Sequence, residues 1–195
     1  MTVDELDQLL SERFNLQRAD LLAALKTLPA IKPGAAVLTE DEARLLDEAG
    51  FVEDPIAFAE AAADIVAHTA LLINTAYTGP EVAALLGINA SRVRQRRLAR
   101  TLWAIESDGA WSYPTIQFEY NLKTGRPDKQ IRGLEQVFQA LPAGLHPTAI
   151  AGFLRTPQTE LQVDGRPLSV LEWLRSGGPV EPVLQLIEIA DWASR

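Results

Sequence analysis

The chain has 195 residues, enough for one large domain or two to three small ones, and its apolar fraction of 47% is ordinary for a globular protein. It contains no cysteine, which excludes disulfides and thiolate metal sites. The net charge of −8 is unevenly spread, because residues 1–64 carry 5 basic and 14 acidic groups whereas residues 65–130 carry 8 and 5. Since DNA repels an acidic protein, any DNA binding would depend on a localised basic surface.

The first 76 residues predict a helical N-terminal region. Capping boxes mark two helix starts, at Thr2 with Glu5 and at Thr39 with Glu42. Leucines at helical spacing continue from the first start to Leu25. The second helix is expected to stop at Gly50. We expect the whole region, residues 1–76, to support dimerisation.

The most apolar window, Pro55 to Ala76, predicts a long helix that begins at a proline. Glu60, Asp64 and His68 interrupt this window, and on that ground we expect no membrane span. The N-terminus also lacks the basic and apolar regions of a signal peptide, so we expect a cytoplasmic protein.

Residues 77–120 predict a helix-turn-helix followed by a β-hairpin wing. Thr78 forms a third capping box with Glu81, and a helix is expected over Gly79–Leu86. Gly87 suits the turn because it tolerates positive φ, and Asn89 or Ser91 can cap the second helix. The hairpin is expected to turn at residues 107–109, which contain an Asp-Gly pair, with Leu102, Ala104 and Ile105 in its first strand and Trp111, Tyr113 and Ile116 in its return.

Five arginines lie within nine residues of the second helix, and no Asp or Glu lies between Glu81 and Glu106. Arginine bonds both phosphates and guanine edges, so this helix is the candidate DNA-binding element. We expect Arg92 and Arg96 to share a face, and Val93 and Leu98 to pack inward. An arginine-rich exposed helix could instead bind an acidic protein, or nothing. The candidate DNA-binding residues are Ser91, Arg92, Arg94, Gln95, Arg96, Arg97 and Arg100.

Aromatic residues and proline cluster in and after the hairpin. They could form a stacking surface for bases, but we expect them to belong to the core and to join the hairpin to the helices. The residues are Trp103, Trp111, Tyr113, Pro114 and Phe118.

Residues 131–195 predict a C-terminal helical module. The polar, turn-rich segment 121–130 is expected to be a linker or exposed loop, and a second turn-rich segment is expected between Thr156 and Pro167. Helices are expected over 131–141, 147–154, 168–174 and from Glu181 to about Trp192. The last eight residues, EIADWASR, predict either a short arm that enters a partner or a frayed end with Trp192 folded on the core.

No enzyme signature is present in the sequence. It has no phosphate-binding glycine loop, nucleophile elbow or metal-ligand spacing, and neither His68 nor His146 has a partner at ligand spacing. We therefore expect no catalytic activity, no cofactor and no metal.

From Gly79 to the C-terminus the chain resembles the Xre/MbcA/ParS family of bacterial antitoxins. The resemblance begins with Trp103, Gly109 and the run Tyr113-Pro114-Thr115-Ile116-Gln117-Phe118. It continues with Gly133-Leu134 and Val137 to Leu141, and then with Gly165-Arg166-Pro167-Leu168 and Glu172-Trp173-Leu174-Arg175-Ser176-Gly177-Gly178. The chain departs from the family in the position of Pro167 and in the first 70 residues, which have no counterpart in the shorter members.

The resemblance implies a type II antitoxin that neutralises a RES-domain, NAD-degrading toxin and represses its own operon. It implies toxin-binding residues in the late segment and at the C-terminal end, and these would be Arg175, Trp192, Ser194 and Arg195. The partners would be the toxin, operator DNA and a second copy of the chain. The alternative is a stand-alone transcription regulator with a ligand- or protein-sensing C-terminal module.

Overall fold

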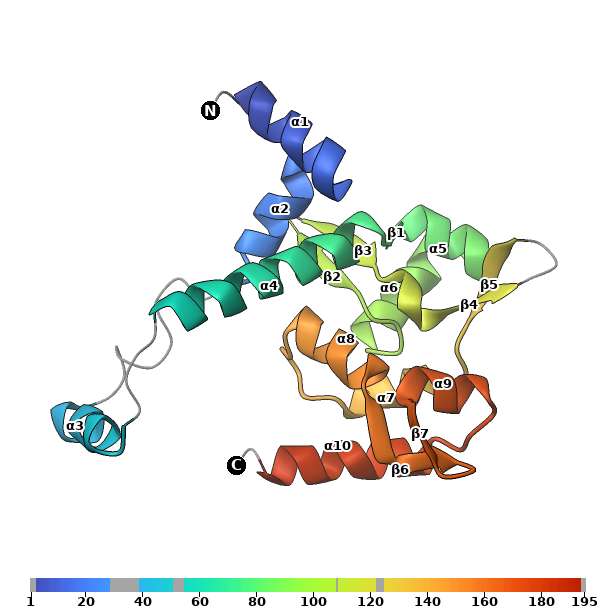
Figure 1. Ribbon diagram of the computed structural model, residues 1–195. Coiled ribbons are helices and arrows are strands. Elements are labelled where there is room, and N and C mark those ends of the chain that lie inside the picture. Colours follow the sequence, from blue (N-terminus) through green and yellow to red (C-terminus); the bar gives the residue numbers. More distant parts are fainter. Residues whose placement is uncertain (1–2, 29–38, 51–54, 108, 122–124, 194–195) are drawn as a thin grey trace. The chain divides into compact units, whose positions relative to one another are not determined.

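The structure is a computed structural model that describes residues 3–28, 39–50, 55–107, 109–121 and 125–193. Its described part is mainly helical, with small antiparallel sheets (Figure 1). Two compact units divide the chain, Met1–Asn74 and Thr75–Arg195. The second unit contains both the segment 77–120 and the segment 131–195.

The first unit is helical throughout its described part. It contains α1 (Val3–Phe14), α2 (Arg18–Leu25), α3 (Glu40–Glu48) and α4 (Pro55–Asn74). The leucine pattern does not form one continuous helix, because the chain turns at Asn15, which has φ 51°. The Asn15 carbonyl accepts a hydrogen bond of 2.7 Å from the Asn74 side chain. α2 packs on α4 through a small buried cluster of Leu16, Ala24, Val66 and Ala70.

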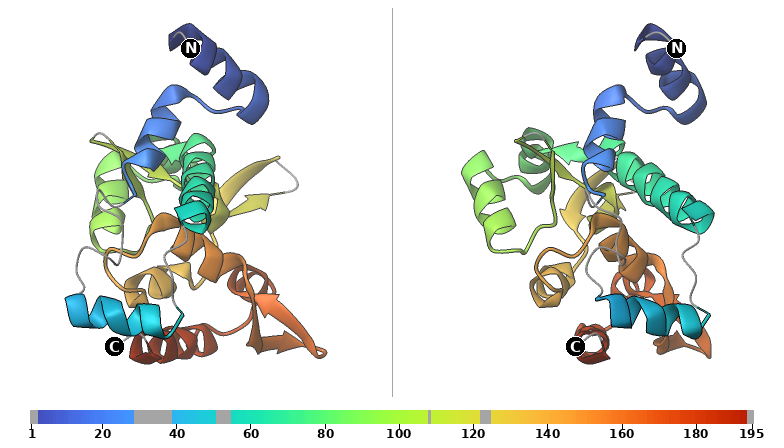
Figure 2. Two further views of the ribbon diagram at one scale, coloured as in Figure 1. Left: turned by 60° about the vertical axis from the view of Figure 1, so that its left-hand side comes forward. Right: turned by 90° about the vertical axis from the view of Figure 1, so that its left-hand side faces the viewer.

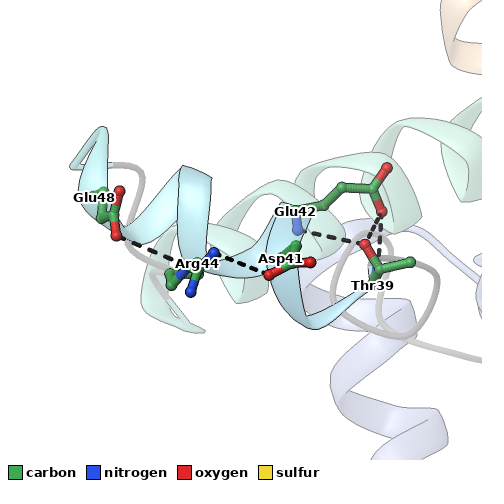
Figure 3. Close-up of polar contacts among 5 residues, drawn as sticks. All are labelled: Thr39, Asp41, Glu42, Arg44 and Glu48. Carbon is green, nitrogen blue, oxygen red and sulfur yellow. Dashed lines mark hydrogen bonds and ion pairs between the residues drawn. The ribbon is translucent and has the colours of Figure 1, made fainter.

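α3 begins at the capping box expected from the sequence (Figure 3). The Glu42 carboxylate accepts hydrogen bonds of 2.8 Å from the backbone and hydroxyl of Thr39, and the pKa of Glu42 is lowered by these bonds. Arg44 lies between Asp41 and Glu48 and pairs with Asp41 at 2.9 Å. Gly50 follows the helix with φ 79°, as expected for its stop. The capping box expected at Thr2 falls outside the described residues.

α4 changes the expectation about membranes. Its segment Ile56–Asn74 is long and apolar enough to cross a membrane, with a mean hydropathy of 1.7 and 22% of that window buried. The interrupting polar residues therefore do not exclude a span on hydropathy grounds. One such helix is weak evidence for a membrane protein, since the core helix of a soluble protein passes the same test. The packing of α4 on α2 is compatible with a soluble protein.

The second unit begins with a helix pair and a three-stranded sheet. It contains β1 (Tyr77–Thr78), α5 (Gly79–Leu86), α6 (Ala90–Leu98), β2 (Ile105–Ser107) and β3 (Ala110–Tyr113). A hairpin β2–β3 is present, but Leu102 and Ala104 precede its first strand and Ile116 follows its second, so those placements were wrong. β1, which pairs Tyr77 with Tyr113, was not expected. Figure 2 shows α5 and α6, in light green, from two further directions. Their shared core comprises Val82, Val93, Leu102, Tyr113 and Phe118.

The polar segment after the helix pair is a hairpin rather than a linker. After a single 3-10 turn over Thr115–Gln117, which contains Ile116, β4 (Phe118–Asn121) pairs antiparallel with β5 (Arg126–Gln130). The prediction of a loop or linker was wrong for Arg126–Gln130. These residues form a strand because their backbone pairs with β4, and they have no apolar pattern that would have predicted it. Lys129 lies opposite Glu119 and pairs with it at 2.9 Å.

The C-terminal part of the second unit mixes helices with a further hairpin. It contains α7 (Leu134–Ala140), α8 (Pro147–Arg155), β6 (Pro157–Val163), β7 (Arg166–Ser169), α9 (Val170–Arg175) and α10 (Glu181–Ala193). The segment expected to be only turn-rich is the hairpin β6–β7, with Asp164 and Gly165 at φ 52° and 77° in its turn. Two positive φ values favour an Asp-Gly pair at such a turn. The module is therefore not purely helical.

The Gly177-Gly178 pair ends α9 for two separate reasons. Gly177 adopts φ 89°, which favours glycine. Gly178 lies under the indole of Trp173, where an added Cβ would come within 2.4 Å of the ring. The Trp173 indole N–H donates a 2.8 Å hydrogen bond to the Pro179 carbonyl, which fixes the ring over this glycine. The residues between Trp173 and Gly178 thus form a packed structural corner.

Candidate nucleic-acid interface

Local hydrogen bonds and backbone geometry fix the start of α5, the turn that follows it and the start of α6. The Glu81 carboxylate accepts from the backbone and hydroxyl of Thr78 at 2.7 and 2.8 Å, and these bonds lower the pKa of Glu81. Gly87 closes α5 with φ 63°, and the Asn89 side chain then caps α6 by accepting from the backbone N–H of Arg92 at 2.8 Å. The turn and caps expected from the sequence are therefore present, with Asn89 and not Ser91 as the cap.

One side of α6 is exposed along its whole length. At about 100° per residue, the side opposite the buried Val93 is centred between Ser91 and Gln95. Leu98 lies on this side and is 63% exposed, so the expectation that it packs inward was wrong. We call the exposed residues Ser91, Arg92, Arg94, Gln95 and Leu98 the solvent face of α6.

Arg96 does not share the solvent face with Arg92. It is half-buried, and its guanidinium donates to the side-chain oxygen of Gln130 on β5. The Gln130 amide nitrogen in turn donates to the Thr101 carbonyl at 2.9 Å. Gln130 therefore joins the end of α6 to the hairpin β4–β5. No local pattern in the sequence indicates this role, because the contact joins residues that are 34 positions apart.

Arg100 terminates α6 in a conformation that usually favours glycine. Its φ is 55°, and the neighbouring N–H groups close a Schellman motif, in which Thr101 donates to the Arg96 carbonyl at 2.9 Å. The Arg100 guanidinium donates to the backbone carbonyl of Leu141, just after α7. This contact orders the side chain inside the unit, so Arg100 is not directed outward with Arg92.

Arg97 lies over the indole of Trp111, with its guanidinium carbon 3.6 Å from the ring centroid. The same guanidinium favours the phenolate of Tyr113 and so opposes the rise in the pKa of Tyr113 that burial causes. Trp111 is 37% exposed and therefore does not belong to the core as expected. The other four members of that group, Trp103, Tyr113, Pro114 and Phe118, are buried as expected.

Gln117 organises the chain under the hairpins, although its role was not foreseen from the sequence. Its side chain is fully buried, and its oxygen accepts from the Trp103 N–H at 3.0 Å. Its amide nitrogen donates to the carbonyls of Trp103 and Pro114 at 2.8 and 3.1 Å. A glutamine in the run Tyr113–Phe118 is thus explained by its hydrogen bonds to three backbone groups of the buried residues Trp103 and Pro114.

Two hollows lie on either side of the solvent face of α6. The first, of about 460 Å³, is lined by Gly87, Ile88, Asn89, Ser91, Arg92 and Gln95. The second, of about 480 Å³, lies between α6 and the sheet, and we call it the α6 groove. It is lined by Gly79, Pro80, Ala90, Val93, Arg94, Arg97, Trp111 and Tyr113. Within the described part of the chain, neither Arg92 nor Arg94 forms an ion pair.

The candidate toxin-binding residues lie only in part within the described residues. Arg175 is exposed in the last turn of α9, and its charge contributes to the lowered pKa of Glu172, after the hydrogen bonds from Ser169. Trp192 belongs to α10, so it does not lie on an arm beyond the last helix. Ser194 and Arg195 fall outside the described residues.

The histidines have structural surroundings. His146 caps α8, where its Nδ1 accepts from the Thr148 N–H at 3.3 Å, and burial lowers its pKa. His68 Nδ1 lies 2.8 Å from the Asp64 carbonyl oxygen on the same helix. Across the residues that the structure describes, no group of three or more His, Asp or Glu side chains could hold a metal ion.

Comparison with known proteins gives no assignment for the chain, because no family model, no curated protein and no solved structure matches it.

Proposed function

We propose that α5 and α6 act as a helix-turn-helix and that the solvent face of α6 enters the major groove of DNA. The observation that carries the proposal is the composition of this face, where two arginines without an ion pair in the described part of the chain flank Ser91 and Gln95. Arginine bonds phosphates and guanine, and glutamine bonds adenine. Arg96, Arg97 and Arg100 support the position of α6 and are not direct DNA contacts in this proposal.

The hairpin β2–β3 occupies the place of a wing in this proposal but does not bind phosphates. Its first strand carries an acidic residue, Glu106, next to the turn. The Glu106 carboxylate accepts a hydrogen bond from the Gly109 N–H at 2.7 Å, which holds a negative charge at the turn. Since carboxylates repel phosphates, affinity for DNA would come from α6.

We further propose that the protein is a cytoplasmic type II antitoxin that blocks a RES-domain toxin and represses its own operon as a homodimer. This part rests on the resemblance from Gly79 onward, with dimerisation assigned to residues 1–76. Neutralisation would be occlusion of the toxin by residues 131–195, including Arg175 and the C-terminal end, and needs no catalysis. A stand-alone transcription regulator would share the DNA-binding face but have no toxic partner.

DNA binding is tested by replacing the two flanking arginines together. We expect R92A/R94A to weaken binding to DNA of the upstream region and to lower the slope of log K against log salt by about 2, one for each lost phosphate contact. The matched control is R155A/R166A, which removes the same charge from exposed arginines outside α6 and outside the region assigned to dimerisation. Equal loss in both variants, or none in either, would contradict the assigned face.

The antitoxin function is tested by co-expression with the adjacent open reading frame. Growth arrest by the neighbour alone, relieved by this chain together with co-purification, is the expected result. Removal of residues 191–195 should weaken the rescue while leaving DNA binding intact. A harmless neighbour that forms no complex would favour the stand-alone regulator, and full rescue by the truncated chain would exclude the C-terminal end as the occluding element.

A further inference from the structure

The α6 groove combines positive charge with apolar walls. Arg94 and Arg97 lie three residues apart on α6 and both line it, and no carboxylate does. Side chains at this spacing are neighbours on a helix surface, with Cβ atoms roughly 5–6 Å apart. Two guanidiniums at that separation can donate to one oxyanion, and such charge-assisted bonds are stronger than neutral ones.

The remaining walls suit a flat apolar group. Pro80, Ala90 and Val93 line the groove together with the rings of Trp111 and Tyr113. The Arg97 guanidinium already lies over the Trp111 ring, so the cation is held at the aromatic wall instead of moving freely in water. A volume of about 480 Å³ lies within the range of small-molecule sites, roughly 300–1,000 Å³.

We propose that the α6 groove binds a small ligand in which a carboxylate or phosphate is attached to a planar ring. The oxyanion lies between Arg94 and Arg97, and the ring lies along Trp111 and the apolar wall of α6. The site shares Arg94 with the proposed DNA-binding face but differs from it, because its ligand is a small molecule and because Arg97 and Trp111, and not Arg92, line the groove. Its test therefore does not depend on whether the protein binds DNA.

The ligand class is tested on the full chain by calorimetric titration with simple probes. Benzoate and phenyl phosphate carry both features, acetate and inorganic phosphate lack the ring, and benzyl alcohol lacks the charge. We expect each ring-bearing anion to bind at least about tenfold more tightly than the probes that lack one feature, because the charge-assisted hydrogen bonds and the burial of the ring each contribute to the affinity. The two ring-bearing anions distinguish a carboxylate ligand from a phosphate ligand.

Two substitutions locate the site. R94Q removes one guanidinium, and A90L fills the groove from an exposed position at the start of α6. Each should lower the affinity for the ring-bearing anions about tenfold or more, whereas R92Q on the opposite flank should leave it unchanged. Circular dichroism and thermal midpoints check that all three variants remain folded. Because Ala90 and Arg94 are both exposed, neither A90L nor R94Q is expected to prevent folding.

Equal affinity in R94Q and R92Q would overturn the proposal, since the binding would then be unspecific attraction to a basic surface. The absence of binding by both benzoate and phenyl phosphate would overturn it as well. Loss of DNA binding in R92A/R94A together with no binding of the probes would leave the proposed function standing and remove only the groove site.

Discussion

The two sides of α6 carry the same residue type in different roles. On the solvent face, Arg92 and Arg94 are exposed. On the inner side, Arg96, Arg97 and Arg100 reach Gln130, Trp111 and the Leu141 carbonyl. Five arginines in nine residues therefore do not form one uniform basic surface. The difference teaches that charge density along a sequence overstates the charge available to DNA when some guanidiniums bond or stack on groups of the same unit.

The largest expected effect on stability comes from Gln117, the buried polar side chain under the hairpins. Q117L should lower the free energy of unfolding by about 3 kcal/mol or more, because it leaves three backbone groups without a partner and each costs about 1–3 kcal/mol. Chemical denaturation measures the loss. The matched control is Q136L on the exposed side of α7, expected to change stability by less than about 0.5 kcal/mol. Similar losses of stability in Q117L and Q136L would mean that the hydrogen bonds of Gln117 do not stabilise the fold.

Arg100 separates backbone strain from its side-chain contact. R100A keeps the strain that the parent already has and loses the contact with the Leu141 carbonyl, so it should destabilise by about 1.5–3 kcal/mol. R100G loses the same contact but relieves the strain, so it should be roughly 1 kcal/mol more stable than R100A. Thermal or denaturant unfolding compares the two variants with the parent. An alanine variant as stable as the parent would show that the guanidinium contributes nothing.

Arg92 and Arg96 provide the direct comparison between the two sides. R96A should destabilise the fold by about 1–2 kcal/mol because it leaves the Gln130 oxygen without its donor. R92A should change stability by less than about 0.5 kcal/mol, since it removes an exposed side chain whose 3.3 Å hydrogen bond to the Gln95 side-chain oxygen is itself exposed. The denaturant midpoints of R96A and R92A, measured in parallel, decide whether the two arginines differ in their contribution to stability. Equal midpoints would break the distinction between the faces.

The stacking of Arg97 on Trp111 should contribute less to stability than the hydrogen bond of Arg96. W111L keeps an apolar side chain but removes the ring, and the loss of a partly exposed cation–π contact is expected to cost about 0.5–1 kcal/mol. The variant W103L provides the contrast, because Trp103 is buried and its loss opens a cavity, with a correspondingly greater loss of stability. If W111L is the more damaging of the two in denaturant unfolding, Trp111 belongs to the core after all.

The smallest effect is the pH dependence of the α5 cap. Hydrogen bonds from Thr78 lower the pKa of Glu81 below its ordinary value of 4.5. The stabilisation is therefore present above that value and is lost as the pH falls through the lower pKa of the folded state. It should amount to well under about 1 kcal/mol because the carboxylate is exposed. Thermal midpoints of the parent and E81Q should converge as the pH falls from 6 to 3, and a constant difference would contradict this assignment.

The sequence was sufficient for elements with strong local signals. The capping boxes predicted at Thr39 and Thr78 lie at helix starts in the structure, and Gly87 adopts the positive φ that its place between two helices predicts. Helix starts and tight turns are fixed by neighbours three or four residues away, so their chemistry can be read along the chain. The exposed Ser91, Arg92, Arg94 and Gln95 were likewise among the candidates for the interface.

Only the tertiary structure decided which arginines are available and which polar segments are strands. β5 and β6 have no continuous alternation of apolar residues, and their pairing with β4 and β7 defines them. Gln117 and Gln130 bond groups that are far away in the chain, and Trp111 is turned outward under Arg97 while Tyr113 is buried. Local sequence determines backbone conformation over a few residues, whereas burial and hydrogen-bond partners depend on contacts that exist only after the segments have packed.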